Sequence, residues 1–271
     1  MKAFMLHFRH DFRAVYTDPS RLFMNYLFPL TVFLLMAFLM TGVNPAFRLQ
    51  MIPAMILFAM MSSTLLFLSS LWISQREAGI YRSYRINGVP ARDILLAPAL
   101  AGIAHLAIVS VLIAAVGHLA FGAPLPAAPV SFALGWLLSA LALAGIAMTI
   151  GTAVAEQRAG MLVAQLVFLP SIMLGGLMMP ADLIPRSLSL LSRLFPAPWA
   201  MEAMMGAGRS PLAMGVLAAT ALAGYAISLA IFEWHTTPLR PPRTRLVALL
   251  VLAPALAGLA ILALGGSGGA S

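Results

Sequence analysis

Long uncharged stretches alternate with short charged segments along this chain. Residues 22–47, 49–75 and 94–155 contain no Asp, Glu, Lys or Arg. A helix needs about 20 apolar residues to cross a bilayer, so each stretch can hold at least one span, and the third can hold two. The pattern therefore predicts an all-α polytopic membrane protein.

Turn-forming residues place the span boundaries inside these stretches. Gly42, Asn44 and Pro45 end the first span, and the proline-rich stretch 124–129 divides the longest stretch into two. The predicted spans cover residues 22–42, 51–74, 95–121, 130–153, 159–178, 211–232 and 246–264. The first six form a core within residues 22–235, the last is an extra C-terminal span, and residues 1–271 form a single membrane domain.

Residues 1–21 have a different pattern, in which apolar and charged side chains lie on opposite faces of one helix. The apolar positions are Phe4, Phe8, Phe12, Val15 and Tyr16, and the charged ones are Lys2, Arg9 and Arg13. This pattern is typical of an amphipathic helix in the bilayer interface. A helix packed on its own protein is an alternative compatible with it. Charged residues interrupt residues 1–21 throughout, so we expect no cleavable signal peptide, which would need a continuous apolar region.

Composition supports a membrane protein, and the arginines indicate its orientation. The chain is 62% hydrophobic and 9% charged, against about 25% charged residues in ordinary globular domains. The chain has a net charge of +8, and its arginines lie beside apolar spans. This placement indicates that the positive charge sets the orientation in the membrane and does not bind nucleic acid. Lys and Arg accumulate in cytoplasmic loops. A cytoplasmic N-terminus puts twelve of the 16 inside and leaves four outside, namely Arg48, Arg186, Arg193 and Arg209. We therefore expect a multi-pass protein of the bacterial plasma (inner) membrane.

The sequence lacks the residues that several kinds of chemistry require. A P-loop needs a lysine, and the only lysine is Lys2. The chain has no cysteine, and all eight acidic residues fall at or beyond span ends, so proton coupling through a buried carboxylate is disfavoured. His7 and His10 alone do not make a metal site. We expect no catalytic residue, metal or cofactor.

The most informative charged segment lies between the second and third spans. It begins at Arg76 and ends at a Gly88-Val89-Pro90 stop, and its notable residues are Arg76, Glu77, Gly79, Arg82, Arg85 and Gly88. Its compactness and charge predict a site where a soluble partner docks, through charge-assisted hydrogen bonds. A loop that faces anionic lipid is the alternative.

Several motifs, in order, resemble those of the membrane subunit of ABC-2 type ABC transporters. Asp18-Pro19-Ser20-Arg21 followed by Phe28-Pro29 is similar to the family's "DPR…P" pattern at its first helix, and residues 75–82 are similar to its "REkGT…R" segment. The run around the fifth helix is matched by Pro170, Gly175, Gly176, Pro180, Pro185 and Pro196. The likeness covers residues 5–235. Ile80 replaces the usual Thr, and the family typically ends after six helices.

The resemblance implies a permease subunit of an exporter, with ATP hydrolysis on a separate P-loop ATPase. It further implies that residues 76–90 contain a coupling helix, that residues 1–21 form an elbow helix, and that short half-inserted helices lie within 179–198. The permease would form a homo- or heterodimer. Two other functions are open: a stand-alone seven-span carrier or sensor, and a non-transporting membrane scaffold.

Overall fold

The computed structural model describes residues 2–175, 177, 186–206, 210–235 and 246–267, and every regular element in these ranges is a helix. Within them, seven helical segments are long and apolar enough to cross a membrane. They are Pro19–Val43, Met51–Glu77, Ala91–Phe121, Pro129–Ala153, Gln157–Leu174, Ser210–Ile231 and Leu246–Leu264. The predicted all-α membrane fold is confirmed, including the apolar helix at 246–264.

The first span begins at a capped end and contains a widened turn. It consists of α2 (Pro19–Leu22), the π-helix η1 (Phe23–Leu27) and α3 (Phe28–Val43). The Asp18 carboxylate accepts a hydrogen bond from the Ser20 backbone N–H at 2.9 Å, and Pro19 occupies the first turn, where its missing N–H costs nothing. The buried Pro29 follows η1. A proline ring clashes with the carbonyl four residues earlier, and the π-turn relieves that clash.

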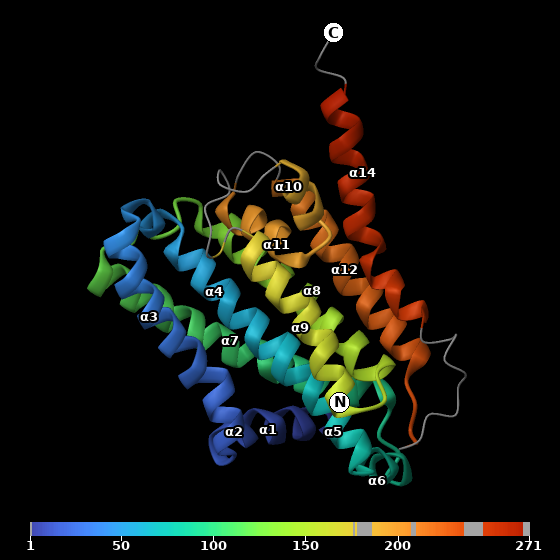
Figure 1. Ribbon diagram of the computed structural model, residues 1–271. Coiled ribbons are helices and arrows are strands. Elements are labelled where there is room, and N and C mark those ends of the chain that lie inside the picture. The colour runs from blue at the N-terminus through green and yellow to red at the C-terminus, as the bar shows by residue number, and fades with distance from the viewer. Residues whose placement is uncertain (1, 176, 178–185, 207–209, 236–245, 268–271) are drawn as a thin grey trace.

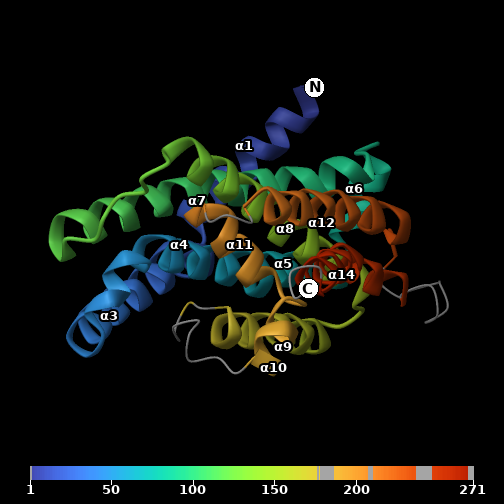
Figure 2. The same cartoon turned by 90° about the horizontal axis from the view of Figure 1, so that it is seen from above.

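The second span is the centre of the bundle. It consists of α4 (Met51–Met61), the π-helix η3 (Ser62–Leu68) and α5 (Ser69–Glu77). Every residue of α4 is buried. In Figures 1 and 2 this span runs between α7 (Ala91–Phe121) and α9 (Gln157–Leu174). A span without a lipid-facing side depends on its neighbours for all of its packing.

The third to fifth spans keep close to their predicted limits. The break at the proline-rich stretch is confirmed, because α7 ends at Phe121 and α8 (Pro129–Ala153) begins after it. Gly122 terminates α7 in the left-handed conformation at φ 66°, which glycine adopts without steric cost. α9 retains Pro170 within it and ends at Leu174, before the predicted limit near residue 178.

Glycines allow the fourth and sixth spans to pack in direct backbone contact. A Cβ built on Gly224 of α12 (Ser210–Ile231) would lie 2.5 Å from the backbone carbonyl carbon of Gly145 in α8. Small residues commonly let membrane helices approach this closely. The α8–α12 pair therefore depends on the absence of a side chain at this crossing.

Two short helices, α10 (Arg186–Ser192) and α11 (Pro196–Met205), precede the sixth span, where short helices are predicted. Gly175, at the end of α9, lies against the start of α11, because a Cβ at Gly175 would be 2.5 Å from the Ala197 Cβ. Pro196 occupies the first turn of α11. Gly176, Pro180 and Pro185 lie outside the described residues.

The seventh span consists of the 3₁₀-helix η5 (Leu246–Leu252) and α14 (Ala253–Ser267). Figure 1 shows α14 running beside α12 and extending past the end of the bundle that carries α10. A Cβ on Gly258 would lie 2.6 Å from Val216 and 2.9 Å from the ring of Trp199. Gly258 thus lets the seventh span fit against α11 and α12.

The N-terminal helix α1 (Lys2–Thr17) lies across the other end of the bundle, near α6 (Ile80–Ile86) (Figure 1). Its anchor is His105, whose Nε2 lies 3.0 Å from the Phe12 carbonyl oxygen and whose Nδ1 lies 2.6 Å from the Tyr26 hydroxyl. A carbonyl only accepts, so Nε2 donates to it and Nδ1 accepts from Tyr26. The ring also stacks on Phe12, with centroids 4.2 Å apart. One face of α1 is therefore packed on the protein.

We predict that Gly224→Ala destabilises the bundle, whereas Gly215→Ala on the same helix does not. The new methyl group at position 224 would overlap the α8 backbone, while a Cβ at Gly215 meets nothing within 4 Å. Overpacking of this kind typically costs about 1–3 kcal/mol. Thermal unfolding of the two purified variants in detergent measures the difference. Equal midpoints would show that the α8–α12 crossing tolerates a side chain.

Candidate functional site

The predicted segment 76–90 is a short helix held between two glycine turns. α5 ends at Glu77, Gly79 turns the chain at φ 73°, and α6 follows directly. Gly88, at φ 70°, turns the chain again before α7. Both angles lie in the left-handed region that glycine alone adopts readily. These turns let α6 fold back beside α5 as a compact unit at the end of the bundle that carries α1.

Arg76 binds the end of α8. Its side chain is 4% exposed, and its guanidinium donates to the carbonyls of Gly151, Thr152 and Ala155 at 3.1, 3.2 and 3.3 Å, and also to that of Val154. The last carbonyls of a helix have no partner within the helix and carry partial negative charge. The guanidinium supplies both the missing hydrogen bonds and the complementary charge.

Glu77, the next residue, binds the beginning of α9. Its carboxylate accepts a hydrogen bond from the backbone N–H of Gln157, the first residue of α9, at 2.9 Å. The Gln157 side chain in turn donates to the Ser70 hydroxyl on α5. A negative charge is favourable at a helix N-terminus, by about 0.3–1 kcal/mol at exposed positions. Two adjacent residues of opposite charge thus connect α5 to the facing ends of α8 and α9.

One face of α6 packs on the bundle through two tyrosines. The Tyr81 hydroxyl donates to the Trp72 carbonyl at 2.9 Å, and the Tyr81 ring stacks on Phe232 just beyond α12, at 5.3 Å between centroids. Burial raises the pKa of the Tyr81 phenol, so it stays a neutral donor. Tyr84 lies against His7 of α1, with ring centroids 5.2 Å apart. α6 therefore contacts elements from both ends of the sequence.

The opposite face of α6 is exposed and carries the remaining predicted cations. Arg82 and Arg85 are exposed, and between and beside them lie Ser83 and Ile86, the latter 78% exposed. A basic surface with an apolar side chain next to it can bind an acidic partner surface through charge-assisted hydrogen bonds. The buried face and the exposed face together make α6 a connector.

The predicted site residues therefore separate into two groups. Arg82 and Arg85 lie on the exposed face, and Gly79 and Gly88 form the turns at its ends. Arg76 and Glu77 instead engage the ends of neighbouring helices. Tyr81, Gln157, Ser70 and Phe232, which complete these contacts, were not predicted. Of these four residues, only Tyr81 could have been recognised in the sequence, because it lies three positions before Tyr84 and so on the same face of a helix.

The described part of the chain holds no group of three or more His, Cys, Asp or Glu side chains that could bind a metal ion. The titratable groups nearest the site are Asp11 and the two histidines beside it on α1. Asp11 is buried on α1, with one carboxylate oxygen 3.3 Å from His7 and the other 3.4 Å from His10. Burial raises the pKa of the Asp11 carboxyl and His7 opposes that change. This cluster joins α1 to Tyr84 and so to α6.

Comparison with known proteins places most of the chain in one family. A sequence model of the family described as "ABC-2 type transporter" matches residues 2–207. No curated protein and no solved structure matches the chain. The matched region includes α1, the segment 76–90 and the first five spans, and it ends before α12 and the seventh span.

We predict that Arg76→Ala lowers the thermal stability of the protein more than Arg82→Ala does. The first change leaves the end of α8 without its buried donors, and losing one partner of a buried hydrogen bond costs about 1–3 kcal/mol. The second change removes an exposed side chain. Unfolding midpoints in detergent, measured by fluorescence-detected size exclusion, test this. If the two variants melt together, Arg76 does not hold α8.

Proposed function

The chain belongs to the ABC-2 type transporter family, and from this membership we propose that it is the permease subunit of an ATP-driven exporter. The ATPase is a separate P-loop protein that docks on α6. The arrangement of Arg76 and Glu77 carries the proposal, since it joins a surface helix to the ends of two membrane spans.

The need for a partner rests on the sequence. Transport against a gradient requires an energy source, and a P-loop requires a lysine that contacts the nucleotide phosphates. The only lysine of this sequence is Lys2. This chain is therefore not the enzyme of the complex; the partner hydrolyses ATP, and the permease itself needs no cofactor.

The exposed face of α6 is the proposed docking surface. Arg82 and Arg85 pair with carboxylates of the ATPase, and Ile86 fits an apolar recess between them. Arginine suits this role because its planar guanidinium pairs with a carboxylate through two parallel hydrogen bonds. The stacked Tyr81 on the opposite face makes α6 move with the bundle when the partner pushes or pulls on it.

Arg76 and Glu77 are the proposed transmission residues. A displacement of α6 shifts the end of α5, and through these two side chains it shifts the end of α8 and the start of α9 together. Packed helices respond to such a shift as units, because their interiors deform little. In this mechanism nucleotide binding in the partner opens and closes a path along the spans.

A second permease subunit, identical or different, completes the path. α9 exposes large apolar side chains, among them Leu162, Leu166 and Leu169, while span two between α7 and α9 is almost wholly buried (Figure 2). This exposed face of α9 forms the proposed dimer contact.

The end that carries α1 and α6 faces the cytoplasm of a bacterium in this proposal, and the protein resides in the plasma membrane. Arg21, Arg76, Arg82, Arg92 and Arg158 all belong to elements that end or begin there. Such an excess of arginine is typical of cytoplasmic loops.

Reversing both exposed charges should abolish docking. We expect Arg82→Glu/Arg85→Glu to lose the ATPase during affinity purification from native membranes while the permease is still inserted. Arg48→Glu, an exposed arginine at the opposite end of the bundle, serves as the matched control and should retain the partner. Retention of the ATPase by the double variant would remove α6 as the docking surface.

Loss of transmission should leave docking intact. In Glu77→Ala the start of α9 loses its acceptor, so we expect the complex to co-purify and hydrolyse ATP while transport in reconstituted vesicles falls strongly. Vesicles with the unmodified complex and with the permease alone provide the comparison. Uphill transport by the permease alone would instead indicate a stand-alone carrier, and no transport by any complex would indicate a scaffold.

A further inference from the structure

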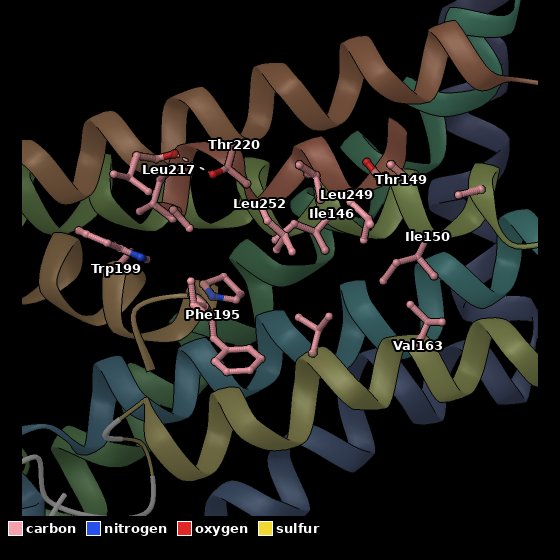
Figure 3. Close-up of a pocket in the computed structure, with 18 of the residues that line it drawn as sticks. Ile146, Thr149, Ile150, Val163, Phe195, Trp199, Leu217, Thr220, Leu249 and Leu252 are labelled. Carbon is pink, nitrogen blue, oxygen red and sulfur yellow. Dashed lines mark hydrogen bonds between the residues drawn. The ribbon is translucent and has the colours of Figure 1, made fainter. Parts of the chain in front are cut away.

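A cavity of about 470 Å³ lies between α8, α9, α11, α12 and η5. In Figure 3 Ile150 and Val163 lie at one end and Phe195 and Trp199 at the other, with Leu249 along its side. It is therefore an elongated space, and its wall comes from spans four, five, six and seven. The volume falls within the range of small-molecule sites, about 300–1,000 Å³.

The wall of this cavity offers almost only carbon. The hydroxyl groups of its two threonines are already paired: Thr149 lies 2.9 Å from the Gly145 carbonyl oxygen of its own helix and 3.3 Å from the Gly224 carbonyl oxygen of α12, and Thr220 donates to the Val216 carbonyl at 2.8 Å. The indole N–H of Trp199 donates to the Arg193 carbonyl at 2.7 Å. With these groups paired, the wall attracts apolar material and has little to offer a polar ligand.

The seventh span shapes one side of the cavity through an unusual helix. η5 is a 3₁₀-helix of seven residues, and such helices seldom exceed three or four residues. Side chains three positions apart are eclipsed in a 3₁₀-helix, so Leu246, Leu249 and Leu252 form one row, and all three line the cavity. An α-helix would distribute these leucines around a wider arc.

The size and surroundings of the cavity limit what can occupy it. A helix with side chains is about 10 Å across, so this volume would hold roughly one turn of it, and a span from a second copy does not fit. The cavity is partly open, and Leu246 and Leu249 remain exposed beside it. Spans four to seven are long and apolar enough to cross a bilayer, so we infer that the opening faces lipid hydrocarbon.

We propose that this cavity binds the hydrocarbon chain of a bilayer lipid, held between the leucine row of η5 and the walls of α8 and α9. The chain fills space that would otherwise cost packing contacts on all sides, and it couples the seventh span to α8 and α9. This site does not rest on the proposed transport function, because a carrier or a scaffold would bind the same lipid.

Photolabelling tests the proposal directly. The full chain is reconstituted in nanodiscs of phosphatidylcholine that contains a fraction with a diazirine at mid-chain, and labelled residues are mapped by mass spectrometry after irradiation. We expect labelling of η5 and of the region around Ile150 well above that of the lipid-facing residues Leu35 and Phe38 on α3, which report ordinary contact with lipid.

Matched substitutions decide whether the cavity is responsible. Ala248→Phe places a ring in the cavity and should reduce its labelling several-fold, and Ala153→Phe does the same from the α8 side. Ala257→Phe makes the same change on an exposed position of α14 outside the wall and should have no effect. In all variants the α3 labelling serves as the internal standard and reports that the protein is inserted.

Three results would overturn the proposal. The first is cavity labelling no greater than that of α3, and the second is labelling unchanged in both filled variants. The third is labelling that disappears from discs holding two copies, which would assign the cavity to a second copy of the chain. A filled variant that no longer labels in the cavity but still transports would support the exporter function whatever the outcome for the lipid site. The lipid-site proposal and the exporter proposal can therefore fail separately.

Discussion

The contact of Arg76 and Glu77 with the ends of α8 and α9 is the interaction on which the arrangement of the central spans depends. Each helix ends with unpaired backbone groups, and near apolar surroundings an unpaired group costs free energy. The guanidinium pairs with the carbonyl end of α8, and the carboxylate pairs with the N–H end of α9. Each charge also matches the sign of the helix end that it contacts. The buried second span is thereby joined to two neighbours at one level, and α6 is connected to both of them through α5.

Within the bilayer the spans are held by close contact and by hydroxyl groups that bond locally. Gly224 and Gly145 bring α8 and α12 together, while serines and threonines such as Thr220 return their hydrogen bonds to their own helix. One bond crosses between spans one and two: the Ser63 hydroxyl donates to the Asn25 side-chain oxygen at 2.8 Å. It joins η3 to η1, and π-turns of this kind frequently occur at functional sites. These two widened turns therefore lie side by side next to the helix α1 that contacts α6.

The seventh span lies outside the part of the chain that matches the family. The family match ends at residue 207, whereas residues 246–264 form an apolar helix that fits against Trp199 and Val216 through Gly258. Its 3₁₀ part stands off from α9 and leaves the cavity between them. A hydrocarbon chain in that cavity would give the fifth span a lipid-dependent neighbour. Because α9 also carries the Gln157 contact with Glu77, lipid at one side and α6 at one end would act on the same helix.

The helical class, the approximate limits of all seven spans and the choice of segment 76–90 as the candidate site could be predicted from the sequence alone. These follow from local properties: uninterrupted apolar length, proline and glycine breaks, and clustered charge. What the sequence does not show is that Arg76 is buried against the end of α8 and that the exposed Glu77 binds the start of α9, whereas Arg82 and Arg85 point away from the bundle. The partners of Arg76 and Glu77 are backbone groups of Gly151 and Gln157, far along the chain. Every residue carries such groups, so no residue type marks them, and only the folded chain brings them to one place.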